Sequence, residues 1–242
     1  MKFNGESTVP STSLSLFLRS LILCLIVFTL SACATVKKPL TGIVAGREVE
    51  TLQSSMSVSV RTGEHTTSGR GFLVYRQPDR FHLALLSPFG LTVFEVFIDG
   101  DKITCLVPSK QLAYSGRFSE LPPDSPLQSM AMMKWVQVHP SPASIPPGTK
   151  ETIDPSGDHY YFDDHSLVDH KVSPEGDKVA YQDYGNVDGV AFPETIVISS
   201  RYGTTVRIVF DEPQINQPVE DGALTPVTEG YKVLPLAEFK GF

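Results

Sequence analysis

The sequence lacks the motifs that carry the common enzyme chemistries. It contains no G-x-S-x-G nucleophile motif, no H-E-x-x-H zinc motif and no glycine-rich phosphate-binding motif. Glu95 lies in an otherwise apolar run, but neither a second carboxylate nor a nucleophile is close to it in the sequence. We therefore expect Glu95 to face outward from a strand interior, and we expect the protein not to be an enzyme.

Positive charge and cysteine are also scarce. Twenty Lys and Arg residues stand against 27 Asp and Glu residues among 242, a formal net charge of −7 with no basic stripe. This balance excludes nucleic-acid binding and polybasic membrane attachment. Of three cysteines, Cys24 lies in an apolar N-terminal segment, and Cys105, in "KITCLV", is expected to be a small buried hydrophobe. Neither a disulfide within the mature monomer nor a cysteine-rich metal motif is predicted.

Potential metal ligands gather in one segment, "DHYYFDDHSLVDH", which contains His159, His165 and His170. Their spacing matches no standard zinc site. Because Asp-Asp-His-Ser is typical of a hairpin turn, we expect a solvated turn here, with metal ligation as the alternative.

Long apolar runs are absent. The longest, Leu21–Leu30, has ten residues and is too short for a bilayer core about 30 Å thick, but typical of a signal-peptide h-region. It ends in "LSAC" at residues 30–33, which resembles the lipobox of bacterial lipoproteins. An ordinary secretory signal or a short anchor is the alternative. The resemblance implies that residues 1–32 are a signal peptide, and that Cys33 becomes an acylated N-terminus strong enough to anchor the chain. Ala34 in place of Asp implies the outer membrane.

Strand patterns dominate the mature chain, whose formal net charge becomes −8 when Lys2, Glu6 and Arg19 leave with the signal. Residues 33–44 are expected to be a tether, and "GREVETLQSS" at 46–55 a short helix. Period-two alternation then predicts an antiparallel meander of about ten strands in one domain over residues 45–215. Such a meander protects its edge strands by curling towards a closed barrel, and one side of the curled sheet then encloses a space. Residues 216–242 form a C-terminal extension, in which "GYKVLPL" is expected to pack back onto the domain.

Two strands flank the loop of "LLSPFGLTVFEVFI" and are apolar on both faces for part of their length. One face must meet a core or a cavity. A Met-rich helix predicted at 127–138 is apolar almost all round and suits a lid, although a plain core helix is the alternative. The expected cavity-lining residues are Phe81, Leu83, Leu85, Phe94, Val96 and Ile98 from the strands and Met130 and Trp135 from the lid.

The loop itself carries Phe89 between Pro88 and Gly90. A large apolar ring gains nothing at a solvated turn tip, so it is expected either to insert into the nearby membrane or to pack on a neighbouring element such as the N-terminal helix.

Taken together, the lipobox, "DRFHLALLSPFG", the interposed helix with Lys134-Trp135 and "FPETIVISSRYGTTVRIVFDEP" resemble the LolB and LolA-like lipoprotein-binding family over residues 45–215. The resemblance implies a mainly β fold, a half-open antiparallel β-barrel of about ten or eleven strands with a helical lid over an apolar cavity. It implies an outer-membrane, lipid-anchored protein on the periplasmic face. Such a protein takes lipoprotein acyl chains from a periplasmic LolA-like carrier and helps to insert them into the membrane. It implies no cofactor, and it assigns the exposed apolar residue between Pro and Gly, here Phe89, to membrane insertion.

The chain departs from the family in its long polar leader, its acidic charge and its C-terminal extension. The alternative is therefore an accessory or structural lipoprotein that uses the same barrel to bind a protein partner or to sense lipid. In that case side chains and "GYKVLPL" fill the cavity.

Overall fold

The computed structural model describes residues 40–44, 46–121, 145–146 and 148–239, all of which belong to one unit of the chain, Pro39–Phe242. The lipidation residue Cys33 and the predicted lid helix, with Met130 and Trp135, lie outside these residues and stay predictions.

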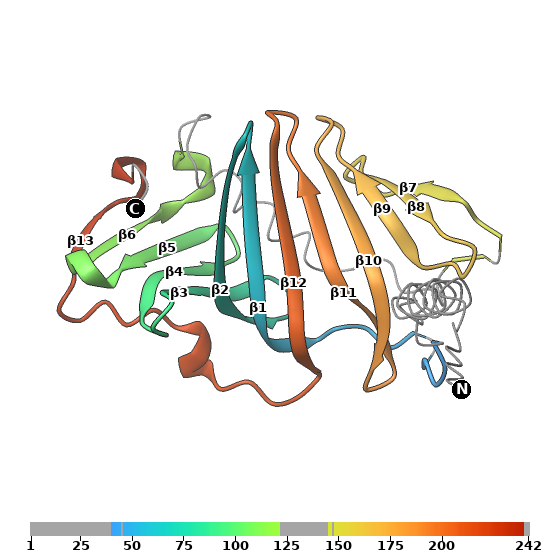
Figure 1. The fold of residues 1–242 in the computed structure, drawn as a ribbon, viewed down its shortest axis with the longest axis horizontal. Helices are drawn as coiled ribbons and strands as arrows, with labels where there is room; N and C mark the ends of the chain where they lie inside the picture. The colour runs from blue at the N-terminus through green and yellow to red at the C-terminus, as the bar shows by residue number, and fades with distance from the viewer. Residues whose placement is uncertain (1–39, 45, 122–144, 147, 240–242) are drawn as a thin grey trace, which may run out of the picture. The chain divides into compact units, whose positions relative to one another are not determined.

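One sheet of thirteen strands forms the described part of the molecule (Figure 1). The strands are β1 (Thr51–Thr62), β2 (His65–Arg76), β3 (Arg80–Leu86), β4 (Thr92–Asp99), β5 (Lys102–Val107), β6 (Leu112–Arg117), β7 (Glu151–Ile153), β8 (His159–Phe162), β9 (Val168–Val172), β10 (Lys178–Val187), β11 (Val190–Ser199), β12 (Thr204–Ile215) and β13 (Lys232–Pro235). Four short 3-10 helices complete it: η1 (Pro108–Lys110), η2 (Phe118–Glu120), η5 (Asp221–Leu224) and η6 (Leu236–Glu238).

The strand order is β13-β6-β5-β4-β3-β2-β1-β12-β11-β10-β9-β8-β7, so the sheet is open, with β13 and β7 as its edges. Neighbours within each half are mostly joined by short turns. The long-range pairing of β1 with β12 joins the two halves, with Val58 opposite Ile208. Every pair is antiparallel except β13 with β6, which is parallel. The expected mainly β meander is therefore confirmed as one open sheet, whereas the half-open barrel and the helical lid stay predictions.

Two expectations about the elements are wrong. The described residues form thirteen strands rather than about ten or eleven, because β7 and β13 have three and four residues and are too short to show an alternating pattern. The short helix expected at 46–55 is also not formed. From Thr51 onward this segment is β1, which is hydrogen-bonded to β2 on one side and β12 on the other. Pairing on both sides outweighs the weak helical preference of the segment.

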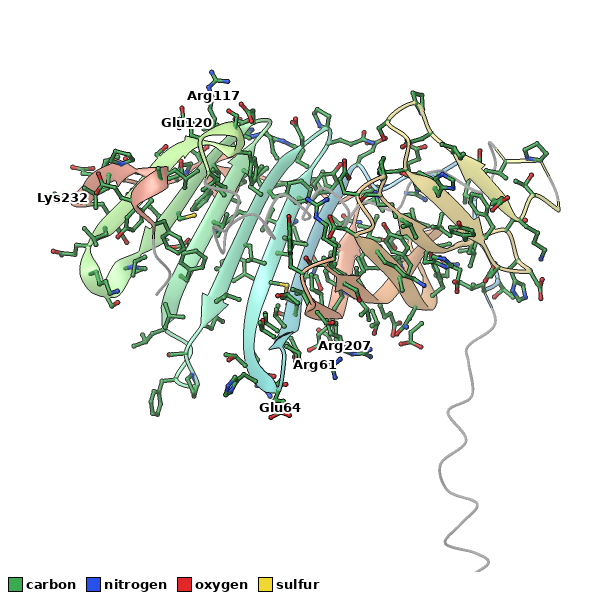
Figure 2. The ribbon with its side chains drawn as sticks, turned by 90° about the horizontal axis from the view of Figure 1, so that it is seen from above. Arg61, Glu64, Arg117, Glu120, Arg207 and Lys232 are labelled. Carbon is green, nitrogen blue, oxygen red and sulfur yellow. The ribbon has the colours of Figure 1, made fainter. Side chains whose placement is uncertain are left out.

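The two faces of the sheet differ in composition. The inner face carries the main hydrophobic core, which extends from β1 through β5 and across β8–β12. On the outer face of β1 and β12 lie Ser59, Arg61, Thr205 and Arg207, and Figure 2 shows Arg61 and Arg207 at the border of the sheet beside Glu64. This alternation of apolar and polar faces fixes the register of the long central strands.

The C-terminal extension contacts both faces of the sheet. We call residues 216–239 the C-terminal strap. It places η5 against β2 and β3, pairs β13 with β6, and ends with η6 against β5 and β6 (Figure 1). The expectation that "GYKVLPL" packs back onto the domain is confirmed.

Candidate functional site

The apolar inner face of β3 and β4 is the candidate binding surface. The six predicted cavity residues of these strands lie on this one face as three cross-strand pairs, Phe81 with Ile98, Leu83 with Val96 and Leu85 with Phe94. Five of them are at most 5% exposed, and Leu85 is half-buried. The alternation of the sequence therefore located one continuous apolar surface correctly, while contact of these side chains with a ligand stays a prediction.

Strand β5 continues this surface with Ile103, Cys105 and Val107. The expected burial of Cys105 is confirmed, because its side chain is fully buried. Burial raises the pKa of the Cys105 thiol to about 12, so the thiol stays protonated and behaves as a small hydrophobe.

The apolar face is larger than the surface predicted from the sequence. The same face extends over the C-terminal half of the sheet through Val179, Tyr181, Ile196, Ile198, Ile208 and Phe210. The signal was present in the alternation of "KVAYQDYG" and "TTVRIVFDEP", but only the pairing of β1 with β12 shows that the two halves share one face. Two residues of the strap, Leu236 and Phe239, also belong to this core.

The β3–β4 loop is a compact, self-supported turn. Gly90 donates its N–H to the Ser87 carbonyl at 2.9 Å, and Leu91 donates its N–H to Ser87 Oγ at 3.1 Å. Gly90 has a φ of +80°, which glycine adopts without strain. The side chain of Phe89 is 91% exposed and that of Leu91 70% exposed. Phe89 is thus not packed on any element that the structure describes, and Leu91, which sequence analysis missed, gives the loop a second exposed apolar side chain.

Behind the apolar face, the outer side of the same strands carries a hydrogen bond between a buried histidine and a carboxylate. His82 Nε2 lies 2.9 Å from Glu95 Oε2, and His82 Nδ1 lies 2.8 Å from the carbonyl oxygen of Ala223 in the strap. The imidazole also stacks on Phe97, with ring centroids 3.9 Å apart. Glu95 lies on the face opposite the core, as expected, and it positions His82 against the strap.

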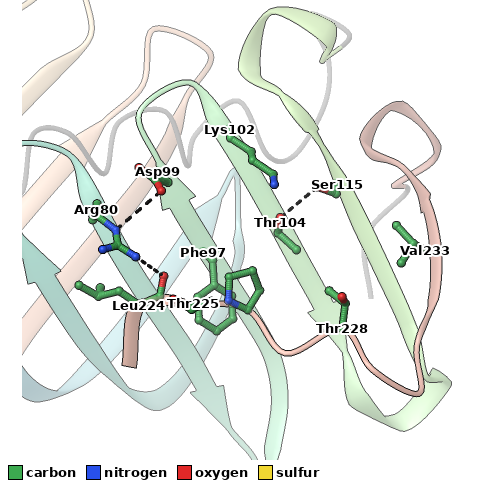
Figure 3. Close-up of a pocket in the computed structure, with 11 residues that line it drawn as sticks. Arg80, Phe97, Asp99, Lys102, Thr104, Ser115, Leu224, Thr225, Thr228 and Val233 are labelled. Carbon is green, nitrogen blue, oxygen red and sulfur yellow. Dashed lines mark hydrogen bonds and ion pairs between the residues drawn. The ribbon is translucent and has the colours of Figure 1, made fainter. Parts of the chain in front are cut away.

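A pocket of about 380 Å³ opens on this outer side, between β3–β6 and the strap (Figure 3). Its walls combine Arg80 and Lys102 with Phe97, the hydrogen-bonded hydroxyls of Thr104 and Ser115, and strap residues such as Thr225. The walls of the pocket are mixed polar and apolar, and the pocket lies on the opposite side of the sheet from the apolar face, so it is not the cavity expected from the sequence.

The histidine-rich segment forms a turn, as expected. Asp163 Oδ1 accepts hydrogen bonds from the N–H groups of His165 and Leu167 between β8 and β9. His170 stacks on Tyr161. In the described ranges no group of three His, Cys, Asp or Glu side chains is arranged to hold a metal ion. A helix of the length and hydrophobicity needed to span a membrane is likewise not found among the residues that the structure describes.

The described part of the chain thus combines an open, mainly antiparallel sheet with one continuous apolar face and an exposed apolar loop. The chain belongs to the LolB family, because the model of the family described as outer membrane lipoprotein LolB matches residues 51–212. This membership supports a lipoprotein-binding role.

Several solved structures are similar to the chain at low sequence identity. A DUF1329 family protein from Desulfovibrio piger is 10% identical with a TM-score of 0.51, covering 73% of this chain and 90% of that one. A putative outer membrane lipoprotein-sorting protein domain from Vibrio parahaemolyticus is 10% identical with a TM-score of 0.49, covering 72% and 88%. A LolA superfamily protein from Nitrosomonas europaea is 10% identical with a TM-score of 0.45, covering 73% and 90%. No curated protein matches the sequence.

Proposed function

We propose that this protein binds the acyl chains of lipoproteins on its apolar inner face and helps to insert them into the outer membrane. The observation that carries the proposal is the combination of this face with the exposed β3–β4 loop, together with LolB family membership. The paired side chains from Phe81 to Ile98 are the proposed contacts on the sheet, with Met130 and Trp135 as proposed contacts from a lid.

The energetics favour an acyl chain as the ligand. Each buried CH₂ contributes about 0.8 kcal/mol, so a long chain supplies ample affinity before the cost of ordering it is subtracted. The protein needs no cofactor for this exchange, because binding and release form no covalent bond. A periplasmic LolA-like carrier is the proposed donor.

Anchoring at Cys33 places the protein at the periplasmic side of the outer membrane in this proposal. The Cys33→Ala precursor should then stay unprocessed by lipoprotein signal peptidase and unacylated, which mass spectrometry of the purified chain measures. Normal acylation of that variant would refute the assignment.

A second candidate function is an accessory lipoprotein that binds a protein partner or senses lipid. The observation that favours it is the strap, because Leu236 and Phe239 occupy part of the inner face with side chains of the protein itself. Under this alternative the face is a closed core.

Binding of an environment-sensitive apolar dye to the chain produced without residues 1–38 separates the two candidates. Acyl-chain binding predicts dye binding at micromolar concentration and displacement of the dye by palmitate. Absence of dye binding would refute the first candidate and leave the accessory role.

A further inference from the structure

The C-terminal strap crosses from one face of the sheet to the other. On the outer face Arg76 and Arg80 bind Asp221, His82 binds Ala223, and Leu224 is 2% exposed. Further on, Tyr231 packs against the outer cluster of Phe97, Leu106 and Ala113.

At the edge of the sheet the strap becomes a strand. Lys232–Pro235 pair with Leu112–Ser115, and Lys232 donates its N–H to the Gln111 carbonyl at 2.9 Å. This pairing covers the edge of β6. The next residues belong to η6, so the chain turns around the edge onto the inner face.

The end of the strap is buried on the inner face. Leu236 is 1% exposed and Phe239 6% exposed. The Phe239 ring lies 5.6 Å from the Phe94 ring and 5.2 Å from the Tyr114 ring, centroid to centroid. Phe94 is one of the six side chains proposed to contact the acyl chain, so Phe239 covers part of that surface.

Gly116 on β6 is required for this packing. A Cβ atom at position 116 would lie 2.8 Å from Leu236 Cβ, closer than such atoms approach, and 2.5 Å from Glu120 Oε2. Glu120 is an exposed, flexible side chain (Figure 2) that can move aside, whereas Leu236 is 1% exposed and has little room to move. The absence of a side chain at Gly116 therefore leaves the space in which η6 packs on the sheet.

We propose that residues 236–239 are an internal occupant of an acyl-chain subsite lined by Phe94, Tyr114 and Gly116, which a cargo acyl chain displaces. This inference rests on the proposed function. We call residues 236–239 the plug, and the surface of Phe94, Tyr114 and Gly116 that they cover the seat. The outer-face contacts of Asp221 and Ala223 hold the strap while the plug leaves the seat. The plug therefore stays close to the seat and returns to it after the cargo is released. A displaceable apolar plug keeps the surface from water when no cargo is bound.

Hydrogen exchange of the full chain in phosphatidylcholine nanodiscs tests the displacement, with a palmitoylated peptide as the probe. Binding of the probe should accelerate exchange of the Lys232 and Phe239 amides, which donate to the Gln111 and Leu236 carbonyls, at least several-fold. The same peptide without palmitate should leave exchange unchanged.

Variants at the seat test the competition. Gly116→Ala and Phe239→Ala should each bind the palmitoylated peptide about tenfold more tightly than the wild type, after subtraction of the peptide that partitions into empty nanodiscs. Gly69→Ala is the matched control, because a Cβ at this glycine of β2 meets nothing within 4 Å, and it should bind as the wild type does. The Phe239→Ala variant keeps the test valid if Gly116→Ala fails to fold.

The possible failures are distinguishable. Probe binding with unchanged or slowed exchange of residues 232–239 and wild-type affinity of both variants would overturn the plug and leave the proposed function intact. No probe binding to any form would overturn both.

Discussion

At the scale of single residues, the exposed fraction of a side chain distinguishes residues that stabilise the fold from residues that are free to contact a membrane. Phe89 and Leu91 protrude from a loop whose backbone hydrogen bonds are internal. A fully buried Phe or Leu contributes roughly 1.5–3 kcal/mol. Two such side chains can orient a protein at a bilayer, but they do not replace a lipid anchor.

Phe89→Glu is expected to leave thermal stability nearly unchanged, because the side chain is 91% exposed and touches no core residue. The variant should still bind an acyl probe but lose transfer of that probe to vesicles, since a charged tip does not enter the bilayer. Calorimetry and a vesicle-transfer assay measure the two properties, with Phe89→Leu as the control that keeps transfer. A lower melting temperature, or normal transfer by Phe89→Glu, would contradict the membrane role.

Lys171 gives a residue-scale prediction about pH. Its side chain is buried in β9, with Nζ 3.7 Å from Asp158 Oδ2 and 5.4 Å from the centre of the Tyr160 ring. Burial lowers the pKa of Lys171 from its ordinary value of 10.5 to about 8, and burial raises the pKa of Asp158. Removal from water thus outweighs the attraction between the two groups.

The sign of the effect follows from proton linkage. Between pH 8 and pH 10.5 the unfolded chain holds a proton on Lys171 that the folded chain has released, so this group makes stability rise with pH in that window. We expect the melting temperature of the wild type to rise between about pH 8 and pH 9.5 relative to the Lys171→Met, Asp158→Asn double variant. Parallel curves for the two proteins would show that Lys171 is not desolvated as described.

At the scale of elements, the alternation of the sequence predicted the longer strands and the shared face of β3 and β4. It could not predict β7 or β13, whose pairing depends on neighbours distant in the sequence. Residues 51–55 were misassigned because their partners, β2 and β12, decide their conformation. Leu91 was missed because a single apolar residue after a turn carries no periodic signal, and the contacts of Met130 and Trp135 fall outside the described residues.

Phe94→Ala tests the packing of these elements. The ring is fully buried between β3 and the strap, so its loss should lower the free energy of unfolding by roughly 3–5 kcal/mol. Leu91→Ala, at a 70% exposed position, is the control and should change the free energy by less than about 0.5 kcal/mol. Urea unfolding measures both. A cost for Phe94→Ala as small as that of the control would mean that η6 and β4 are not packed as described.

At the scale of the whole molecule, one sheet presents a continuous apolar face, and the chain's own strap covers one end of it. Family membership supports a lipoprotein-binding role, and delivery of the lipoprotein to a membrane is our proposal. The sequence indicated this role through its lipobox and its strand pattern. Only the structure, however, shows that both halves of the chain build the face and that the C-terminus returns to it.

The most direct test of the central claim is photo-crosslinking of the purified protein with a palmitate that carries a diazirine on its chain, followed by mass spectrometry of the peptides. Binding on the inner face predicts labels on residues 81–85 and 94–98, and competition by unlabelled palmitate should remove them. Labels confined to the exposed loop at 87–91, or labels that palmitate does not compete away, would contradict acyl-chain binding by this sheet.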